Sequence, residues 1–313
     1  MKSGILNMYK PTDMTSFSMV AVVRGITREK AGHLGTLDPM AEGVLPVGIG
    51  GASRVMDYLD ADIKEYRGTA RIGLKTDTQD IWGTVIEDSP DASVSFDRLK
   101  DAAEALTGVI SQVPPAYSAV KIDGKRLYAY ARDGKVHEIK SKIKSRKVFI
   151  EKLEIPELNG RDFSFVVRCT KGTYIRTICH DIGEILGCGA AMTSLVRTKS
   201  GIFTADSGMT PDMMRSMDRA QIEKRVVSTG DALVNLGKAA LGAREEQMFR
   251  NGVTLRAYQW KALETPRYAE EEYPLPLREI FRKGYKVYGP CERFIGVGFA
   301  PGDGSLRPDK VFD

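Results

Sequence analysis

The apolar positions of the chain follow helical spacing in some segments and strand spacing in others. Residues 65–74 and 163–170 alternate apolar with polar side chains, as strands do, and the apolar Val166 suggests burial on both faces of the second strand. Three other segments carry apolar stripes at helical spacing. These predicted helices cover 16–26, where Thr15 or Ser16 can cap the first turn, 99–106 and 175–185.

The predicted strands and helices are intermingled without a regular order. This pattern favours an α+β fold, with a mixed and largely antiparallel sheet flanked by helices, over a doubly wound parallel sheet. A further charged helix is expected over residues 212–225.

The composition changes near Lys238, after which short strand-like runs are separated by glycine and proline. Two of these runs, 284–289 and 294–298, predict a pair of strands, and we expect this strand pair to be basic, with Arg282, Lys283, Lys286 and Arg293. The segment 258–274 is polar without a clear period and is interpreted as a loop or linker. We therefore predict two domains, 1–237 and a small β-rich domain at 238–313.

The bulk composition is that of an ordinary globular protein. Hydrophobic residues make up 42% of the 313 positions and charged residues 28%, which is enough apolar material for a buried core. No apolar run approaches the roughly 20 residues of a membrane span, and the start of the chain lacks the apolar stretch of a signal peptide, so we expect a cytoplasmic protein. The cysteines form no CxxC pair and the histidines are scattered, so we expect neither disulfides nor a metal.

The net charge of +5 is mildly basic, and its distribution is uneven. Residues 121–147 contain ten lysines and arginines against three acidic residues. Such a segment can bind a phosphate backbone, but it is equally typical of a solvated charged surface, and both interpretations stay open at this stage.

The segment with the clearest candidate chemistry is GHLGTLDPMAEGVL at residues 32–45, where the carboxylate of Asp38 stands among glycines and is followed by proline. Pro39 fixes its own φ and favours an extended conformation at Asp38, which can direct the side chain outward. A lone carboxylate in a loop is more often a turn or a helix cap than a catalytic group. The loop also lacks the spacing of a phosphate-binding P-loop.

The same loop resembles the catalytic motif of the TruB-type pseudouridine synthases, in which the aspartate is essential. Four further segments resemble motifs of this family in the expected order. They are NMYKP at 7–11, KEYRGTARIGLKTDTQD at 64–80, PPAYSAVKIDGKRLY at 114–128 and KGTYIRTI at 171–178. The resemblance covers residues 5–235, and the remaining tail is more weakly similar to a PUA-type RNA-binding domain.

The resemblance implies an enzyme that isomerises uridine 55 in the T loop of tRNA to pseudouridine, flipping the base out of the loop. Asp38 would be the nucleophile, Tyr66 would stack on the target base, and Arg176 would pair with the aspartate and keep it ionised. No cofactor is implied, because the reaction is an isomerisation. Whether the carboxylate attacks the ribose or the base is left open.

Four residues are assigned to RNA binding by the same resemblance. His33 would fill the space that the flipped base leaves, Tyr174 would be a second aromatic residue near the base, and Leu195 would lie beneath it. Lys10 would contact either the loop region or the RNA. The sequence departs from the family pattern at Val196, where a basic residue is usual, and at Glu42, where a small hydroxyl residue is common.

The expected protein is a stand-alone tRNA enzyme that works as a monomer, needs no protein partner and binds no membrane. Two alternatives compete with this interpretation. The first is a guide-RNA-dependent relative with the same catalytic core. The second is an RNA-binding protein in which Asp38 is only structural. The tail is expected to be an accessory RNA-binding domain whose removal weakens tRNA binding but leaves the catalytic step intact.

Overall fold

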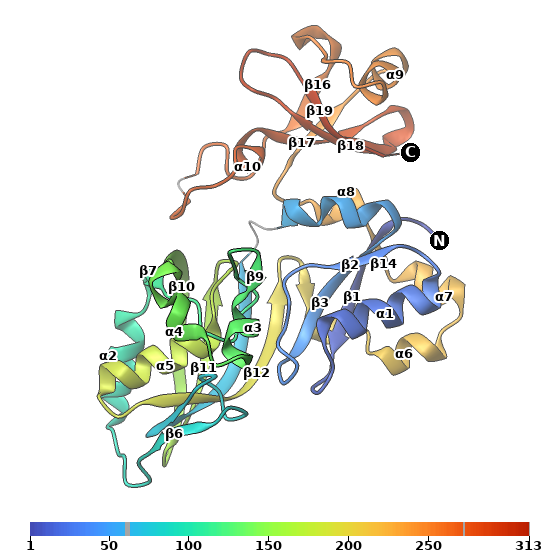
Figure 1. Ribbon diagram of the computed structural model, residues 1–313. Coiled ribbons are helices and arrows are strands. Elements are labelled where there is room, and N and C mark those ends of the chain that lie inside the picture. Colours follow the sequence, from blue (N-terminus) through green and yellow to red (C-terminus); the bar gives the residue numbers. More distant parts are fainter. Residues whose placement is uncertain (60–62, 272, 313) are drawn as a thin grey trace. The chain divides into compact units, whose positions relative to one another are not determined.

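The structure is a computed structural model that describes residues 1–59, 63–271 and 273–312. The chain divides into two compact units (Figure 1). Unit 1 comprises Met1–Asp62 and Lys199–Asp313, and unit 2 comprises Ile63–Thr198. In the described part of the chain, every helix is too short or too polar to cross a membrane.

An antiparallel sheet in unit 1 leads into the glycine-rich loop. Strand β1 (Gly4–Lys10) lies between β14 (Val226–Ser228) and β3 (Glu42–Ile49), and the short β2 (Ala31–His33) also pairs with β3. Helix α1 (Ser16–Thr27) buries its apolar stripe in one core with side chains of β1 and β3. Thr15 caps it by accepting a hydrogen bond from the Ser18 backbone N–H at 2.9 Å, so the predicted helix and one of its two predicted caps are confirmed.

The chain leaves β3 through the 3₁₀ helix η1 (Gly50–Leu59), which lies very close to the strand. A Cβ atom on Gly48 would lie only 2.8 Å from Met56 Sδ and 3.2 Å from the backbone of Ala52. Only glycine allows this approach, which explains one of the glycines that surround the candidate loop.

The charged helix expected over residues 212–225 is divided into two. Helix α6 (Pro211–Ser216) ends before Met217, whose backbone is extended, and α7 (Arg219–Lys224) begins after Asp218. Asp218 forms a capping box with Gln221, because each side chain bonds to the other's backbone N–H. This strong start signal overrides the continuous polar pattern, so the prediction of one helix was wrong. The short elements near it are β13 (Phe203–Thr204), η3 (Ala205–Ser207) and α8 (Thr229–Ala232).

The end of the chain forms a second, five-stranded sheet. Its strands, in spatial order, are β16 (Lys261–Glu264), β15 (Gly237–Ala240), β17 (Gly284–Tyr288), β18 (Phe294–Phe299) and β19 (Arg307–Val311). Helices α9 (Ala243–Arg250) and α10 (Ile280–Lys283) and the turns η4 (Ala257–Gln259) and η5 (Pro290–Glu292) connect them. The predicted strand pair is confirmed as β17 and β18, which are antiparallel.

Two expectations for the tail need correction. The segment 258–274 contains the edge strand β16, which is exposed along its whole length and therefore shows no apolar period. Arg282 and Lys283, which we expected in a strand, belong to helix α10. The β-rich C-terminal domain is present, whereas its boundary at residue 238 and its PUA-type character stay predictions.

The tail shares a hydrophobic core with η1. Buried side chains of η1, among them Val55, Tyr58 and Leu59, pack in one cluster with Phe281 and Phe312 of the tail. The Tyr58 hydroxyl donates a hydrogen bond to the Asp309 carboxylate of β19. The Arg54 guanidinium lies 4.6 Å from the centre of the Phe312 ring and donates a hydrogen bond to the Val311 carbonyl. The second sheet is thus built into the same unit as the glycine-rich loop.

Unit 2 contains a sheet whose described pairings are antiparallel, with two helices packed together beside it (Figure 1). The strands, in spatial order, are β12 (Ala190–Ser200, its last two residues in unit 1), β4 (Lys64–Ile72), β11 (Asp162–Cys169), β10 (Arg146–Asn159) and β7 (Gly108–Gln112). The helices are α2 (Phe96–Ala105) and α5 (Ile175–Leu186). Both predicted strands and both predicted helices of this region are confirmed, and with them the α+β fold class.

The remaining elements of unit 2 are short. They comprise the hairpins β5 (Leu74–Thr76) with β6 (Val85–Asp88) and β8 (Lys121–Ile122) with β9 (Lys125–Arg126), the helices α3 (Leu127–Arg132) and α4 (Val136–Ile139), and η2 (Lys140–Lys142). Most of the basic segment at 121–147 therefore lies on small hairpin and helical elements with a core of only Ile122, Leu127 and Ile139.

Candidate active site

Asp38 lies in the loop between β2 and β3, and its side chain is partly exposed. The residue before it is clamped by Ser16 from the first turn of α1. The Leu37 backbone N–H donates to Ser16 Oγ at 2.8 Å, and Ser16 Oγ in turn donates to the Leu37 carbonyl at 3.0 Å. After Asp38 the backbone turns, with the Ala41 N–H donating to the Asp38 carbonyl at 3.1 Å. The backbone position of this carboxylate is therefore fixed by α1.

Lys10 binds backbone carbonyls in and near the same loop. Its side chain is fully buried, and the ammonium donates to the carbonyls of Pro11 at 2.9 Å, Met14 at 2.6 Å and Pro39 at 3.0 Å. A buried ammonium needs such acceptors, because burying the charge without them is very costly. Of the two roles expected for Lys10, contact with the loop region is the one seen here. Its assignment to RNA binding stays a prediction.

His33 ends β2 and is partly exposed. Its ring nitrogen Nε2 lies 3.2 Å from Thr36 Oγ1, a contact within the same loop. Between them, Gly35 has φ +67°, a conformation that L side chains rarely adopt. The chain therefore turns sharply here. His33 and Asp38 lie in one loop of unit 1, and the Lys10 ammonium binds a backbone carbonyl of the same loop.

Glu42, one of the two departures from the family pattern, lies close enough to Tyr9 of β1 to affect its hydroxyl. Burial, followed by the negative charge of Glu42 and a hydrogen bond with it, raises the pKa of the Tyr9 hydroxyl. The tyrosine therefore stays protonated and can act as the donor to the carboxylate. Glu42 at the start of β3 thus interacts with Tyr9 on the neighbouring strand β1.

The other predicted site residues belong to unit 2. Tyr66 on β4 is 8% exposed and Leu195 on β12 is 7% exposed, and these two strands are neighbours in the sheet. A nearly buried tyrosine and leucine on adjacent strands offer an apolar surface for a flat ring. Their burial alone is also what ordinary core residues would show, so their roles stay predictions.

Tyr174 precedes helix α5, and its backbone is held by the side chain of Gln112. Gln112 Oε1 accepts from the Tyr174 N–H at 2.8 Å, and Gln112 Nε2 donates to the Tyr174 carbonyl at 3.1 Å. Arg146 donates to the Tyr174 hydroxyl at 3.3 Å, with its guanidinium 5.0 Å from the ring centre. These interactions present an aromatic ring and a cation together, a combination suited to nucleic acid.

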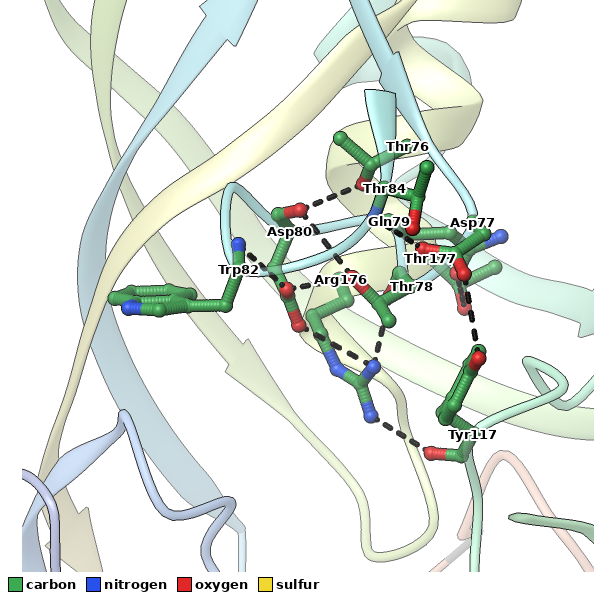
Figure 2. A network of polar contacts seen from close by, with 10 residues as sticks. All are labelled: Thr76, Asp77, Thr78, Gln79, Asp80, Trp82, Thr84, Tyr117, Arg176 and Thr177. Atoms are coloured by element: carbon green, nitrogen blue, oxygen red, sulfur yellow. Dashed lines mark hydrogen bonds and ion pairs between the residues drawn. The ribbon is translucent and has the colours of Figure 1, made fainter. Parts of the chain in front are cut away.

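Arg176 in the first turn of α5 is 5% exposed and belongs to a network of polar contacts (Figure 2). Its Nη1 donates to the Thr78 carbonyl at 2.8 Å and its Nη2 to the Tyr117 carbonyl at 3.1 Å. The fully buried Asp80 carboxylate lies 3.4 Å from Nη1. The arginine is thus buried and oriented by a set of acceptors, and it does not belong to a surface ion pair.

The turn that carries Asp80 is held by its own side chains. Asp80 Oδ1 accepts from Thr78 Oγ1 at 2.7 Å and from the Trp82 N–H at 3.1 Å, so this carboxylate both supports the turn and binds Arg176. Asp77 accepts from the Tyr117 hydroxyl at 3.2 Å. Burial, then the charge of Asp77 and this hydrogen bond, raise the pKa of Tyr117, which keeps its hydroxyl a donor.

Sequence reasoning missed Gln112, and for Asp80 it left two roles open, support of the turn or binding of an arginine of the site. Gln112 is 1% exposed, and its signal was a polar residue at an inward position of a strand, just before the proline pair at 114–115. The buried Arg197 was also missed, although it follows the departure at Val196 directly. A basic residue that is 1% exposed cannot be a surface phosphate contact.

Comparison with known proteins identifies the family. The model of the TruB family pseudouridylate synthase N-terminal domain matches residues 24–175, and that of the tRNA pseudouridylate synthase B C-terminal domain matches residues 176–232. The tRNA pseudouridine synthase B of Clostridium perfringens is 37% identical over 95% of this chain and 94% of its own. This chain belongs to the TruB family of pseudouridylate synthases. The corresponding enzyme of Clostridium novyi is 37% identical over 99% of both chains.

Two solved structures show the same fold. A chain in the crystal structure of a Cbf5-Nop10-Gar1 complex matches 99% of this chain and 85% of its own, with a TM-score of 0.73 and 25% identity. A chain of the archaeal box H/ACA sRNP Nop10-Cbf5 complex matches 99% of this chain and 86% of its own, with a TM-score of 0.70 and 24% identity.

Proposed function

We propose that the protein is a tRNA pseudouridine synthase that isomerises uridine 55 in the T loop, with Asp38 as its nucleophile. The observation that carries the proposal is the loop at residues 32–45, which presents a partly exposed carboxylate on a backbone fixed by Ser16 and Lys10. Relatives that share 37–39% of their residues with this chain are tRNA pseudouridine synthases B, and they match over most of its length.

The reaction breaks the bond between N1 and the ribose carbon, rotates the uracil and joins C5 to the same carbon. N1 gains a proton and C5 loses one, so the isomerisation needs no redox step and no energy source. Asp38 supplies the carboxylate that acts as nucleophile on the substrate. The detached uracil has to be held away from water, because hydrolysis at that stage would leave an abasic site.

Tyr66 is assigned to stacking on the target base and Leu195 to the apolar surface beneath it. Both side chains are nearly buried, on neighbouring strands of the sheet. Tyr174 is assigned to the same bound base, and His33 to the space that the flipped base leaves in the loop. Arg176 is assigned to orienting the reacting groups, and its pairing with Asp38 is inferred from the family resemblance.

The protein is proposed to work alone, as a monomer on the T stem-loop of tRNA. The relatives with 37–39% identity carry the name of a single enzyme, whereas the chains in complexes with other proteins share only 24–25%. The guide-RNA-dependent function therefore has less support than the tRNA function.

The test is tritium release from C5-labelled, unmodified tRNA by the purified protein, followed by mapping of the modified position. We expect release without any guide RNA or added protein, and pseudouridine at position 55. Release only with a guide RNA and partner proteins would support the guide-dependent relative. No release under any of these conditions would support an RNA-binding protein without catalysis.

Replacing Asp38 by Asn tests the nucleophile, because the amide keeps the shape of the carboxylate but loses its charge. We expect turnover to fall below about a thousandth of wild type while tRNA affinity stays within about tenfold. Asp57→Asn, at an exposed position of η1 in the same unit, is the matched control and should leave turnover unchanged. Turnover of Asp38→Asn above that limit would exclude Asp38 as the nucleophile.

A further inference from the structure

The chain has two tryptophans, and one of them, Trp82, lies in the turn that joins β5 to β6. This turn is closed at both ends by hydrogen bonds. Asp77 Oδ1 accepts from the Thr84 N–H at 2.7 Å, and Thr76 Oγ1 donates to the Asp80 carbonyl at 2.6 Å. Gly83 leaves no room for a side chain, because a Cβ atom there would lie 2.2 Å from Thr78 Oγ1. The backbone that carries Trp82 is therefore rigid.

The position of Trp82 is also tied to that of Arg176. The Asp80 carboxylate accepts from the Trp82 N–H through Oδ1 at 3.1 Å and faces the Arg176 guanidinium through Oδ2 at 3.4 Å. One buried carboxylate thus holds the tryptophan backbone and the arginine together. Any ligand that contacts Trp82 is held in a fixed relation to Arg176.

The indole ring itself is not part of the polar network that holds the turn. Trp82 is 49% exposed, and Figure 2 shows its ring pointing away from the polar network. Within the described residues, its Nε1 has no hydrogen-bond acceptor. Trp260 shows the opposite pattern, since its Nε1 donates to the Gly304 carbonyl at 3.0 Å and its ring packs edge-on against Tyr285 at 5.2 Å. Trp260 is structural, whereas Trp82 presents a free aromatic face.

We propose that Trp82 is an additional RNA-binding residue whose indole stacks on an unpaired base of the tRNA substrate other than the target uridine. This inference rests on the proposed function. Single exposed apolar residues are common on proteins and need no explanation by themselves. Here a large flat ring is exposed on a rigid turn and coupled to a proposed active-site residue, and such pre-organised rings are how proteins bind unpaired bases. The target base is already assigned to Tyr66, so Trp82 contacts a different one.

Fluorescence tests the stacking directly, because a stacked base quenches indole emission. Wild type and Trp82→Phe are each titrated with unmodified tRNA, and the difference between them reports Trp82 alone, without any change at Trp260. We expect the emission of Trp82 to be quenched on saturation. If the difference in emission does not change on saturation with tRNA, the proposal is wrong. It is also wrong if the emission of Trp82 changes with protein concentration in the absence of RNA, because a second copy of the chain would then cover the ring.

Affinity and turnover separate this role from a structural one. We expect Trp82→Ala to weaken tRNA binding by roughly five- to 150-fold, the equivalent of one base stack, and to leave the saturated rate within about threefold of wild type. Trp82→Phe keeps an aromatic face and should restore most of the affinity. If Ala and Phe bind tRNA as tightly as wild type, or if Phe is as weak as Ala, the stacking role is wrong. Pseudouridine formation by wild type tests the proposed function independently of these variants.

Discussion

The carboxylate of Asp80 is fully buried, and its two oxygens have different partners. One accepts hydrogen bonds from Thr78 and from the backbone of Trp82, and the other faces Arg176. Truncating one member of such a buried pair usually costs several kcal/mol, because the remaining charge has been taken out of water. At the scale of single residues, the orientation of Arg176 therefore depends on a side chain that is far from it in sequence.

Asp80→Asn is expected to lower the saturated rate of pseudouridine formation by roughly ten- to 150-fold, the equivalent of one charge-assisted hydrogen bond. The amide can still accept from Thr78 and Trp82, but its NH₂ group cannot replace the oxygen that faces Arg176. Single-turnover rates measure the effect, and the tRNA affinity should change little.

Asp77→Asn is the matched control for that substitution. Asp77 lies in the same turn, and its partners are the Thr84 N–H and the Tyr117 hydroxyl, both of which an amide can satisfy. We expect its rate to stay within about threefold of wild type. Equal decreases in the two variants would mean that the turn matters only as a folded element and that the pairing with Arg176 has no separate role.

At the scale of elements, the C-terminal sheet packs on η1, the helix that follows the strand after the candidate loop. Tyr58 of η1 is 2% exposed and bonds to Asp309 of β19, and apolar side chains of η1 pack in one cluster with Phe281 and Phe312 of the tail. Helix η1 follows β3 directly, and Gly48 of β3 lies close to its Met56. The second sheet thus stabilises the strand that follows the candidate loop.

Removing the tail tests this coupling. A chain that ends at Gly237 exposes the η1 side chains that pack with Phe281 and Phe312, so we expect it to be insoluble or to unfold at a clearly lower temperature than wild type. This revises the expectation of a detachable RNA-binding domain. Thermal unfolding and single-turnover rates of the truncated chain measure it. A soluble product with a normal saturated rate and weaker tRNA binding would show instead that the tail is separable.

The Tyr58 hydrogen bond has its own pH signature. Burial, followed by the hydrogen bond and the charge of Asp309, raises the pKa of Tyr58 far above its usual range near 10. The unfolded chain ionises this phenol above about pH 10 while the folded protein does not, so the stabilisation is complete below that pH and declines as the pH rises further.

Tyr58→Phe is expected to lower the free energy of unfolding by about 1–3 kcal/mol at about pH 8, since it removes a buried hydrogen bond to a carboxylate. The difference between variant and wild type should shrink as the pH rises above about 10. Urea unfolding below and above that pH measures both effects, and Tyr258→Phe, at a position 80% exposed, is the control. A difference that does not depend on pH would show that the hydroxyl is not held in its protonated form by folding.

At the scale of the whole molecule, some of the lysines that give the chain its positive charge are paired with acidic residues and others face solvent. Within the basic segment, Lys125 pairs with Asp133 at 2.5 Å and Lys142 with Asp123 at 2.6 Å. Lys140 on η2 and Lys144, which follows η2, are both exposed. The segment has little apolar core to hold it, so its solvent-facing cations are well suited to binding phosphates.

Lys140→Ala combined with Lys144→Ala is expected to weaken tRNA binding and to reduce its salt dependence. The slope of log K against log salt should become shallower by about 0.7–0.9 for each phosphate that the variant no longer neutralises. Lys142→Ala, whose charge already pairs with Asp123, should change the slope less. Filter binding over a range of salt concentrations measures these slopes, and an unchanged slope in the double variant would mean that the segment is only a solvated surface.

The sequence by itself determined the local elements and the family. The α1 helix, its Thr15 cap and the strands β4, β11, β17 and β18 follow from apolar period and capping chemistry, which act over a few residues. The motif around Asp38 and four further segments identified the family. Local signals fail where a strand has no buried face, as in β16, and where one cap divides a polar helix, as at Asp218.

Only the tertiary structure decided which residues support others. The sequence left open whether Asp80 supports its turn or binds an arginine of the site, and the structure shows both contacts. Nothing in the sequence indicates that the Lys10 ammonium is enclosed by three carbonyls or that Tyr58 bonds to Asp309. Each of these interactions joins groups whose meeting depends on how the strands and turns pack. Their energies come from burial and from hydrogen-bond geometry, and both are set by the packed fold, whereas sequence patterns report only spacing along one element.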